Sequence, residues 1–544
     1  MRTRGLITLA VATSALLVSC TVDPTVTAER SDQIASQLPT PTTTPAETTD
    51  PSQNDPAQDD PTATDPPSTD PTANDPPATD PAVTDPTEDP ANTAPSPSVA
   101  PDQIDPAAID FGPNKTPHDY DDFLRAVMTD LQSWWSAEYP AVYGDAFEPL
   151  RGGVYAAYPN RPDDLPGCGE PRTTYEDVQQ FVAFYCGQGD FIIYDDGDDG
   201  LLAQLAGQYG PGTIGIVLSH EFGHAIQTRA GALDSDLPTV FTEQQADCFA
   251  GAWAGRVSRG ESSIVSFSDA DVRSGLIAMT KVSDPVGLNQ FVEGGHGSAF
   301  DRVGAFQVGF TEGAARCAEL LDSPLPLSLN QFDQSELSTG GNAPLGYGQG
   351  ELLDFIPADL NLYWSDEVGA ETGSIDDVTL VRATSADEVE CDDPAGAFEL
   401  GAAYCASTNT VYVNDRAVQE IYDALGDFSV GYVVGTAWSE AVQQALGSEL
   451  EGEDRALLND CLTGAWVKTT VPVDDGTGGL ALPQPRAAER TSRVSAGDLD
   501  EAIQTIIGIS DGSSDDDVRG GLFEKIGAFR QGVVEGLDSC LADL

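Results

Sequence analysis

Two histidines stand four positions apart in a segment that is expected to be helical. The segment His220-Glu221-Phe222-Gly223-His224 has the pattern H-E-x-x-H. Residues four positions apart project from one face of a helix, so His220 and His224 can bind the same metal ion. Glu221 lies beside that face, where its carboxylate can take a proton from a water that the metal activates. The chain has only four histidines, which lowers the chance that the pattern is accidental.

A catalytic zinc site needs a third protein ligand, and an acidic pair follows at a suitable distance. Glu243 comes nineteen residues after His224, and Asp247 shares its helical face. Because two histidines and one glutamate are a common catalytic set, we expect Glu243 to be the third ligand. Asp247 would then accept the ring N–H of a liganding histidine. Two alternatives stay open: Asp247 as the ligand, or a pair of solvated carboxylates.

His296 is the remaining candidate for a catalytic role. It lies in a glycine-rich segment, residues 293–298, that is expected to form a loop. A histidine beside the metal could donate a hydrogen bond to the oxyanion that forms during hydrolysis. The alternative is a surface histidine without a role.

The residues around these motifs predict the elements that must position them. Apolar residues flank the histidine motif, which predicts a helix over 214–229, and a second helix over 242–256 carries the acidic pair. A strand is expected at 153–158, and a hairpin at 181–186 and 191–194. Further helices are expected at 120–138, 201–209, 269–282 and 300–321. Few strands and several helices predict an α+β fold.

The second half of the chain repeats motifs of the first in the same order. The residues Asp247-Cys248 and Trp253 reappear as Asp460-Cys461 and Trp466. Repetition at similar spacing predicts two copies, at 105–325 and 345–544, with a joint at 326–344. The positions of His220, Glu221, His224 and Glu243 are taken in the second copy by Thr436, Ala437, Glu440 and Ala456. The second copy is therefore expected to be metal-free.

The cysteines divide equally between the two copies. After Cys20, each copy has four, and an even number in an exported chain favours disulfides. The repeated pattern makes pairing within each copy the simplest solution. We therefore expect the bonds Cys168–Cys186, Cys248–Cys317, Cys391–Cys405 and Cys461–Cys540.

The N-terminus has the pattern of an export signal. Arg2 and Arg4 precede an apolar stretch, residues 6–17, that is too short to span a bilayer. The following Leu17-Val18-Ser19-Cys20 resembles a bacterial lipobox, in which the cysteine becomes the lipidated N-terminus. Residues 1–20 are thus expected to be a lipoprotein signal peptide, with the protein anchored at the outer face of the cell membrane. An ordinary secretory signal with a chance cysteine is the alternative.

Residues 21–104 differ in composition from the rest of the chain. They consist largely of Asp, Pro, Thr and Ala and contain almost no large apolar side chains. Such a segment cannot bury enough surface to offset its conformational entropy, so we expect a disordered acidic linker. The formal net charge of −64 would repel phosphates, which argues against a nucleic-acid partner.

The two motifs together resemble the neutral zinc metallopeptidases of bacterial envelopes. The resemblance rests on residues 219–227 and 243–251, and it extends to Cys168, Tyr185-Cys186 and His296-Gly297-Ser298 with Arg302. It covers most of the first copy. It implies a gluzincin-like fold, Zn²⁺ held by His220, His224 and Glu243, and a general base at Glu221.

These observations predict a zinc peptidase, built as a tandem zincin-like duplication, that cleaves peptides or envelope proteins. Amidase action on cell-wall peptides is not separated from proteolysis by the sequence. A different class of function also stays open, namely a non-catalytic binding or scaffold lipoprotein with a structural zinc.

Overall fold

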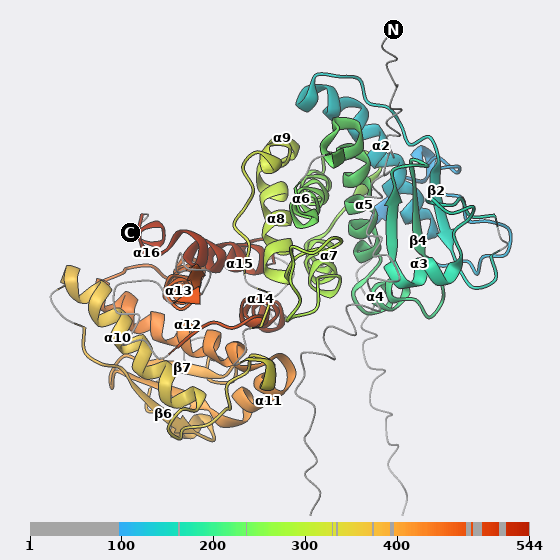
Figure 1. Cartoon of the computed structure of the whole chain (residues 1–544). Helices are drawn as coiled ribbons and strands as arrows, with labels where there is room; N and C mark the ends of the chain where they lie inside the picture. Colours follow the sequence, from blue (N-terminus) through green and yellow to red (C-terminus); the bar gives the residue numbers. More distant parts are fainter. Residues whose placement is uncertain are drawn as a thin grey trace, which may run out of the picture.

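The computed structural model describes residues 97–542, apart from 162–163, 235–236, 329, 333–335, 373–374, 392–395, 475–479, 482–491 and 511–517. The expected signal peptide, Cys20 and the linker up to residue 96 lie outside the described residues. The described part is a mixed α+β structure, mostly helical with small sheets (Figure 1). This agrees with the predicted fold class.

A three-stranded sheet lies beside the helices of the first half. Its strands are β2 (Gly153–Ala157), β4 (Phe191–Asp195) and β3 (Ala183–Cys186), in that order. β2 runs parallel to the central β4, and β3 runs antiparallel to it. The antiparallel β3–β4 pair confirms the predicted hairpin.

One helix before this hairpin was not predicted. α3 (Tyr175–Phe181) begins at Thr174, whose side chain forms a capping box with Asp177. Phe181, expected in a strand, is the last residue of this helix, and Val182 follows with a positive φ of 67°. The prediction erred because apolar residues at the end of a short helix run directly into the apolar strand.

In its described residues, the first half also contains six helices of at least nine residues. They are α2 (Asp121–Tyr143), α4 (Leu201–Tyr209), α5 (Gly212–Ala230), α6 (Thr239–Ser258), α7 (Asp269–Lys281) and α8 (Ala299–Glu312). The single helix expected over 300–321 is wrong. It breaks at Gly313, where φ is +83°, and continues as α9 (Ala314–Ala318) and a 3-10 turn (Glu319–Leu321).

The expected linker is shorter than predicted at its C-terminal end. β1 (Ser98–Val99) pairs with β5 (Val265–Ser266), so these residues belong to the folded part. Among the described residues, none of the helices combines the length and apolar character needed to cross a bilayer.

The second half contains a sheet of the same order and orientation as the first. β6 (Thr379–Ala383) runs parallel to the central β8 (Thr410–Asn414), and β7 (Ala402–Cys405) runs antiparallel to it. Around it lie α10 (Leu352–Thr372), α11 (Asp415–Leu425), α12 (Asp427–Leu446), α13 (Gly452–Lys468), α14 (Asp498–Ile509), α15 (Val518–Glu535) and α16 (Leu537–Cys540).

In each half, two long helices make a close backbone contact, and a disulfide ties one of them to the short helix that follows the other. α6 and α8 approach where Gly251 faces the Phe306 carbonyl, and a side chain there would collide with it. α13 and α15 approach in the same way at Gly464. All four predicted disulfides are confirmed: Cys168–Cys186, Cys248–Cys317, Cys391–Cys405 and Cys461–Cys540.

The two halves lie against each other rather than apart. Figure 1 shows α14 and α15, in red, between the helices of the second half and the green helices α7 and α8 of the first. α14 packs against α7, α8 and α12, and α15 also contacts α7 and α8. α8, the helix that follows the segment containing His296, is therefore covered by the C-terminal part of the chain.

Candidate metal centre

The close packing of α5 against α6 brings the two sequence motifs together. Every residue of α5 from Gly212 to Gln227 is buried. At the centre of the histidine motif, a side-chain carbon on Gly223 would lie only 3.0 Å from the Cα of Ala246 in α6. The glycine therefore lets the two helix backbones approach, which places the side chains of α5 and α6 in direct contact.

His220, His224 and Glu243 converge at this contact. The distance from His220 Nε2 to Glu243 Oε2 is 3.1 Å, and that from His224 Nε2 to Glu243 Oε1 is 3.4 Å. One potential ligand atom from each of the three residues lies within 4.8 Å of the others, and all three side chains are buried. The structure thus brings Glu243, and not Asp247, to the Nε2 atoms of the histidines.

Asp247 holds the opposite nitrogen of His220. Its Oδ1 lies 2.6 Å from His220 Nδ1. Arg302 of α8 donates two hydrogen bonds to the same carboxylate, at 2.8 and 2.7 Å, and a third to the carbonyl of Val282 at 2.5 Å. The fork of two charge-assisted bonds fixes the plane of the carboxylate, and with it the orientation of the imidazole.

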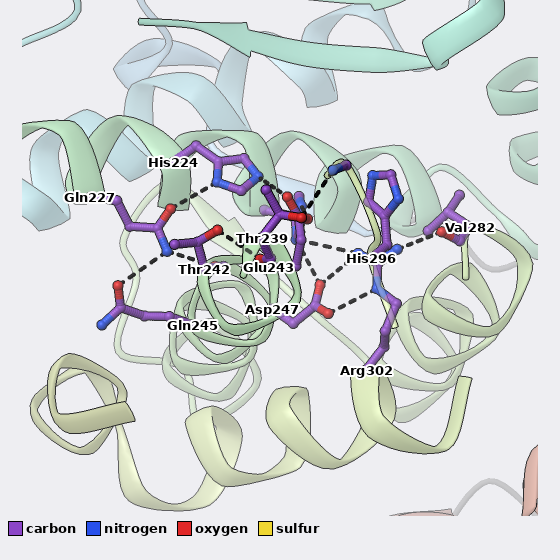
Figure 2. Close-up of polar contacts among 12 residues, drawn as sticks. His224, Gln227, Thr239, Thr242, Glu243, Gln245, Asp247, Val282, His296 and Arg302 are labelled. Carbon is purple, nitrogen blue, oxygen red and sulfur yellow. Dashed lines mark hydrogen bonds and ion pairs between the residues drawn. The ribbon is translucent and has the colours of Figure 1, made fainter. Parts of the chain in front are cut away.

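His224 is oriented by a separate hydrogen-bond chain. Its Nδ1 lies 2.8 Å from Gln227 Oε1, while Gln227 Nε2 donates to the carbonyl of Thr242 and to Gln245 Oε1. Because the amide nitrogen of Gln227 is used as a donor, its oxygen must accept, so His224 carries its proton on Nδ1. Figure 2 shows the Gln227 chain on one side of Glu243 and Arg302 with Asp247 on the other.

The two Nε2 atoms are suited to bind a metal ion. Both are buried and have no hydrogen-bond partner of suitable geometry in the described part of the chain. The two Nε2 atoms thus lie 3.1 and 3.4 Å from the Glu243 carboxylate without hydrogen-bond alignment. Two imidazole nitrogens and one carboxylate, with the other ring nitrogens already engaged, form a donor set that fits Zn²⁺.

The electrostatics of the centre favour positive charge at this position. Burial would lower the pKa of His220, but Asp247 and Glu243 raise it to about 10. Burial would raise the pKa of Glu243, yet His224, His296 and His220 hold it well below its ordinary value. The two buried carboxylates thus stay ionised and stabilise either protonated histidines or a bound cation.

A cavity of about 290 Å³ opens beside the centre. Its lining includes His220, Glu221 and His296, together with the apolar side chains of Phe181 and Val217. Glu221 is buried, and it follows directly after the first histidine on α5. The cavity therefore brings two predicted catalytic residues to one side of the candidate ligands.

His296 is held in this cavity by Asp284. The backbone N–H groups of His296 and Gly297 donate to Asp284 Oδ2 at 2.8 and 3.0 Å, and His296 Nδ1 lies 3.4 Å from Oδ1. These hydrogen bonds help to lower the pKa of Asp284, so it stays ionised. The His296 side chain is therefore half-buried, with Asp284 as its partner.

A second histidine cluster has a different character. His118 lies near Asp121 and Asp196, but the Nζ of Lys115 lies 2.8 Å from Asp121 and 2.9 Å from Asp196. A buried ammonium group thus already compensates these carboxylates. Asp195 and Asp196 are themselves buried.

The corresponding position of the second half holds an ion pair. Glu440 Oε2 lies 2.6 Å from Arg455 Nε, and Glu440 also accepts from Asn459. Trp438 is buried and donates to Asn361 Oδ1 at 3.2 Å, so it fills the core. Glu440, which stands at the position of His224 in the sequence repeat, is therefore paired with Arg455 and Asn459.

Three residues around the candidate centre had no role assigned from the sequence: Gln227, Asp284 and Arg302. Gln227 lies three positions after His224, on the same helical face, and this spacing is a signal that could have identified it. Asp284 and Arg302 carry no such signal. The partner of Asp284, His296, lies twelve residues away in the same irregular segment, and the partner of Arg302, Asp247, lies on another helix.

Comparisons with known proteins give limited information. No protein-family profile matches the chain, and no solved structure is similar to it. A stretch of 152 residues is 34% identical to uncharacterized proteins of Mycobacterium tuberculosis and Mycobacterium bovis, covering 24% of this chain and 52% of each relative. The chain spans about half the length of these relatives, and their names supply no activity.

Proposed function

We propose that the first half is a zinc-dependent peptidase. The observation that carries the proposal is the convergence of His220, His224 and Glu243 beside a cavity that also contains Glu221 and His296. His220, His224 and Glu243 would hold the zinc, and Asp247 and Gln227 would fix the two imidazoles through their Nδ1 atoms.

The chemistry divides between the ion and the protein. A bound zinc supplies a Lewis acid that polarises a carbonyl and makes water more acidic. Glu221 accepts the proton of the attacking water and passes it to the leaving amine. His296, oriented by Asp284, donates a hydrogen bond to the oxyanion of the scissile group.

The cavity supports an open coordination position, as a catalytic rather than a structural zinc site requires. It favours the peptidase over a scaffold protein with a structural zinc. Its apolar wall, which includes Phe181, Val182, Leu201 and Val217, suits peptides or envelope proteins as substrates. Amidase action on cell-wall peptides uses the same groups and is tested with the same protein.

The decisive experiment compares two variants at the candidate centre. Glu221→Gln should retain one zinc per chain and reduce peptide cleavage by at least about 100-fold, because it removes the general base. His224→Ala should lose both the metal and the activity. The zinc content is measured by elemental analysis after metal loading. Cleavage is assayed with peptide mixtures, envelope proteins and cell-wall peptides. Glu440→Gln, the matched variant in the second half, should change neither. Absence of zinc from the loaded wild-type protein would reject the proposal.

We also propose that the protein is exported and lipid-anchored at Cys20. The support is the lipobox-like sequence Leu17-Val18-Ser19-Cys20. Cys20→Ser should leave an unprocessed precursor or release the protein from the membrane. Mass spectrometry of the mature N-terminus checks this, and unchanged membrane fractionation of the variant would contradict lipidation.

We further propose that the two halves are a tandem zincin-like duplication whose second copy has lost its metal site. The support is the equal strand order of the two sheets and the matching disulfides Cys248–Cys317 and Cys461–Cys540. Equivalent tryptophans also make equivalent contacts, since Trp253 donates to Asp130 and Trp466 to Asp359.

A further inference from the structure

Two adjacent acidic residues in the first turn of α14 cap helices in different halves. Asp500 accepts the backbone N–H groups of Ala299 and Phe300, at 3.1 and 2.7 Å, at the start of α8 in the first half. Glu501 accepts the N–H of Phe428, at 2.7 Å, at the start of α12 in the second half. One turn of α14 therefore ties together two helix N-termini from opposite halves.

The start of α8 is directly connected to the candidate metal centre. The loop residue His296 precedes α8 by three positions, and Arg302 lies in its first turn. Arg302 holds Asp247 by two hydrogen bonds, and Asp247 holds His220. The path from Asp500 to His220 thus consists of one helical turn and two side chains.

Asp500 accounts for most of the capping of α8. Among the N–H groups of the first turn, the side-chain oxygen of Ser298, the N-cap residue, accepts a hydrogen bond from that of Asp301. The N–H groups of Ala299 and Phe300 depend on Asp500, which is itself buried. The positive end of a helix dipole attracts a carboxylate, and a buried N–H group without an acceptor costs free energy. The first turn of α8 therefore depends on Asp500, about 200 positions away, for two of its hydrogen bonds.

Arg530 of α15 supports the same turn from the second half. Its guanidinium donates to the carbonyl of Phe300 and lies 4.0 Å from the centroid of the Phe300 ring. Gly304, one turn further along α8, has no side chain at the position that Arg530 fills, and a Cβ there would collide with it. Residues of the second half therefore contact the start of α8 in three ways. They accept from its N–H groups, donate to its Phe300 carbonyl, and stack on its Phe300 ring.

We propose that Asp500 is a positioning residue for the metal centre: by capping α8, the second half holds Arg302, and through Asp247 it fixes the orientation of His220. The proposal rests on the proposed zinc site. It assigns to the metal-free half a definite role in the first half's chemistry, and it makes the site dependent on both halves.

The test uses the full chain with Asp500→Ala, Asp500→Asn and the matched control Glu501→Gln. Asp500→Ala removes both acceptors from α8, and Asp500→Asn keeps one of them. Glu501→Gln alters the neighbouring cap on α12 and leaves α8 untouched. Three quantities are measured for each variant. Zinc affinity is obtained by chelator competition, and kcat and KM are obtained with a peptide substrate. Amide hydrogen exchange is measured in the metal-free protein.

Asp500→Ala should speed exchange at residues 299–302 and weaken zinc binding by about three- to tenfold, less than the 10- to 100-fold typical of a direct partner of a ligand. It should lower kcat more than it changes KM, and Asp500→Asn should give intermediate values. Glu501→Gln should affect exchange only at the start of α12. The proposal is overturned if Asp500→Ala leaves both α8 exchange and zinc affinity within twofold of wild type, or if Glu501→Gln has the same effects. A wild-type protein that binds no zinc would reject the proposed function, while α8 exchange still decides whether Asp500 holds this helix.

Discussion

At the scale of single residues, the centre is defined by the groups behind the candidate ligands. His220 and His224 are both engaged at Nδ1, the first by Asp247 and the second by Gln227. This leaves both Nε2 atoms directed toward Glu243. The partners of the ligands thus decide the tautomers, and they should contribute measurably to metal affinity.

Asp247 offers a direct test of this view. Asp247→Asn replaces an ionised acceptor with a neutral amide, so zinc affinity should fall by about 10- to 100-fold. Asp460 is a matched control, because it is the corresponding residue of the second half and contacts Tyr432. Asp460→Asn should leave zinc affinity unchanged. Chelator competition on both variants gives the answer, and equal affinities for Asp247→Asn and wild type would contradict the assigned role.

At the scale of elements, the α6–α8 pair is the framework of the site. α6 provides Glu243 and Asp247, and α8 provides Arg302. Gly251 and Gly309 allow the two backbones to touch, and the Cys248–Cys317 disulfide ties α6 to α9 just beyond α8. Gln245, which takes part in the His224 chain, also donates to the Cys317 carbonyl at 3.0 Å.

The equivalent disulfides should therefore differ in function though not in stability. Replacing both cysteines by alanine at Cys248–Cys317 or at Cys461–Cys540 should each cost about 4 kcal/mol in the chain-entropy model, since the loops are similar in length. Only the first replacement should also weaken zinc binding, because Cys248 adjoins Asp247. Denaturant unfolding and metal titration measure the two effects. Loss of zinc affinity in both variants would argue against a local cause.

At the scale of the whole molecule, the contact between the halves concentrates buried acid. Burial raises the pKa of Asp301 to about 6, of Asp500 to about 7 and of Glu501 to about 8. It also raises the pKa of Asp427 and Asp498. Arg530 lies near Asp301, and burial lowers the pKa of its guanidinium to about 10. The interface therefore binds protons more tightly than the unfolded chain does.

This arrangement predicts a stability that falls as the pH rises. A carboxyl group whose pKa is higher in the folded protein than in the unfolded chain stabilises the folded state while it is protonated. This contribution is complete below the unfolded pKa of about 4, and it is lost as the pH rises through the folded values of about 6 to 8. Asp284, whose pKa is lowered, contributes in the opposite sense and loses its effect in acid. The Tm of the metal-free protein should drop by roughly 5 °C between pH 5 and pH 8. Glu501→Gln removes the group that titrates at the highest pH, so the Tm measured by calorimetry should depend less on pH near pH 8. A Tm that rises over this range would contradict the prediction.

The sequence by itself determined the local features of the protein. The spacing of His220 and His224 identified α5, the pairing of eight cysteines followed from a repeated pattern, and the β3–β4 hairpin followed from two apolar runs around glycines. These features depend on residues within a few turns or on exact repetition. The order of such residues along the chain is enough to reveal them.

Only the tertiary structure decided which groups stand behind the site. The placement of Glu243, rather than Asp247, at the Nε2 atoms and the contact of Arg302 with Asp247 depend on how α5, α6 and α8 pack. The link from Asp284 to His296 depends on how the segment between α7 and α8 folds. The contact of Asp500 with Phe300 is likewise a product of packing. Residues 200 positions apart share no local periodicity, so their contact arises from the burial of whole helices against one another and leaves no pattern in the sequence.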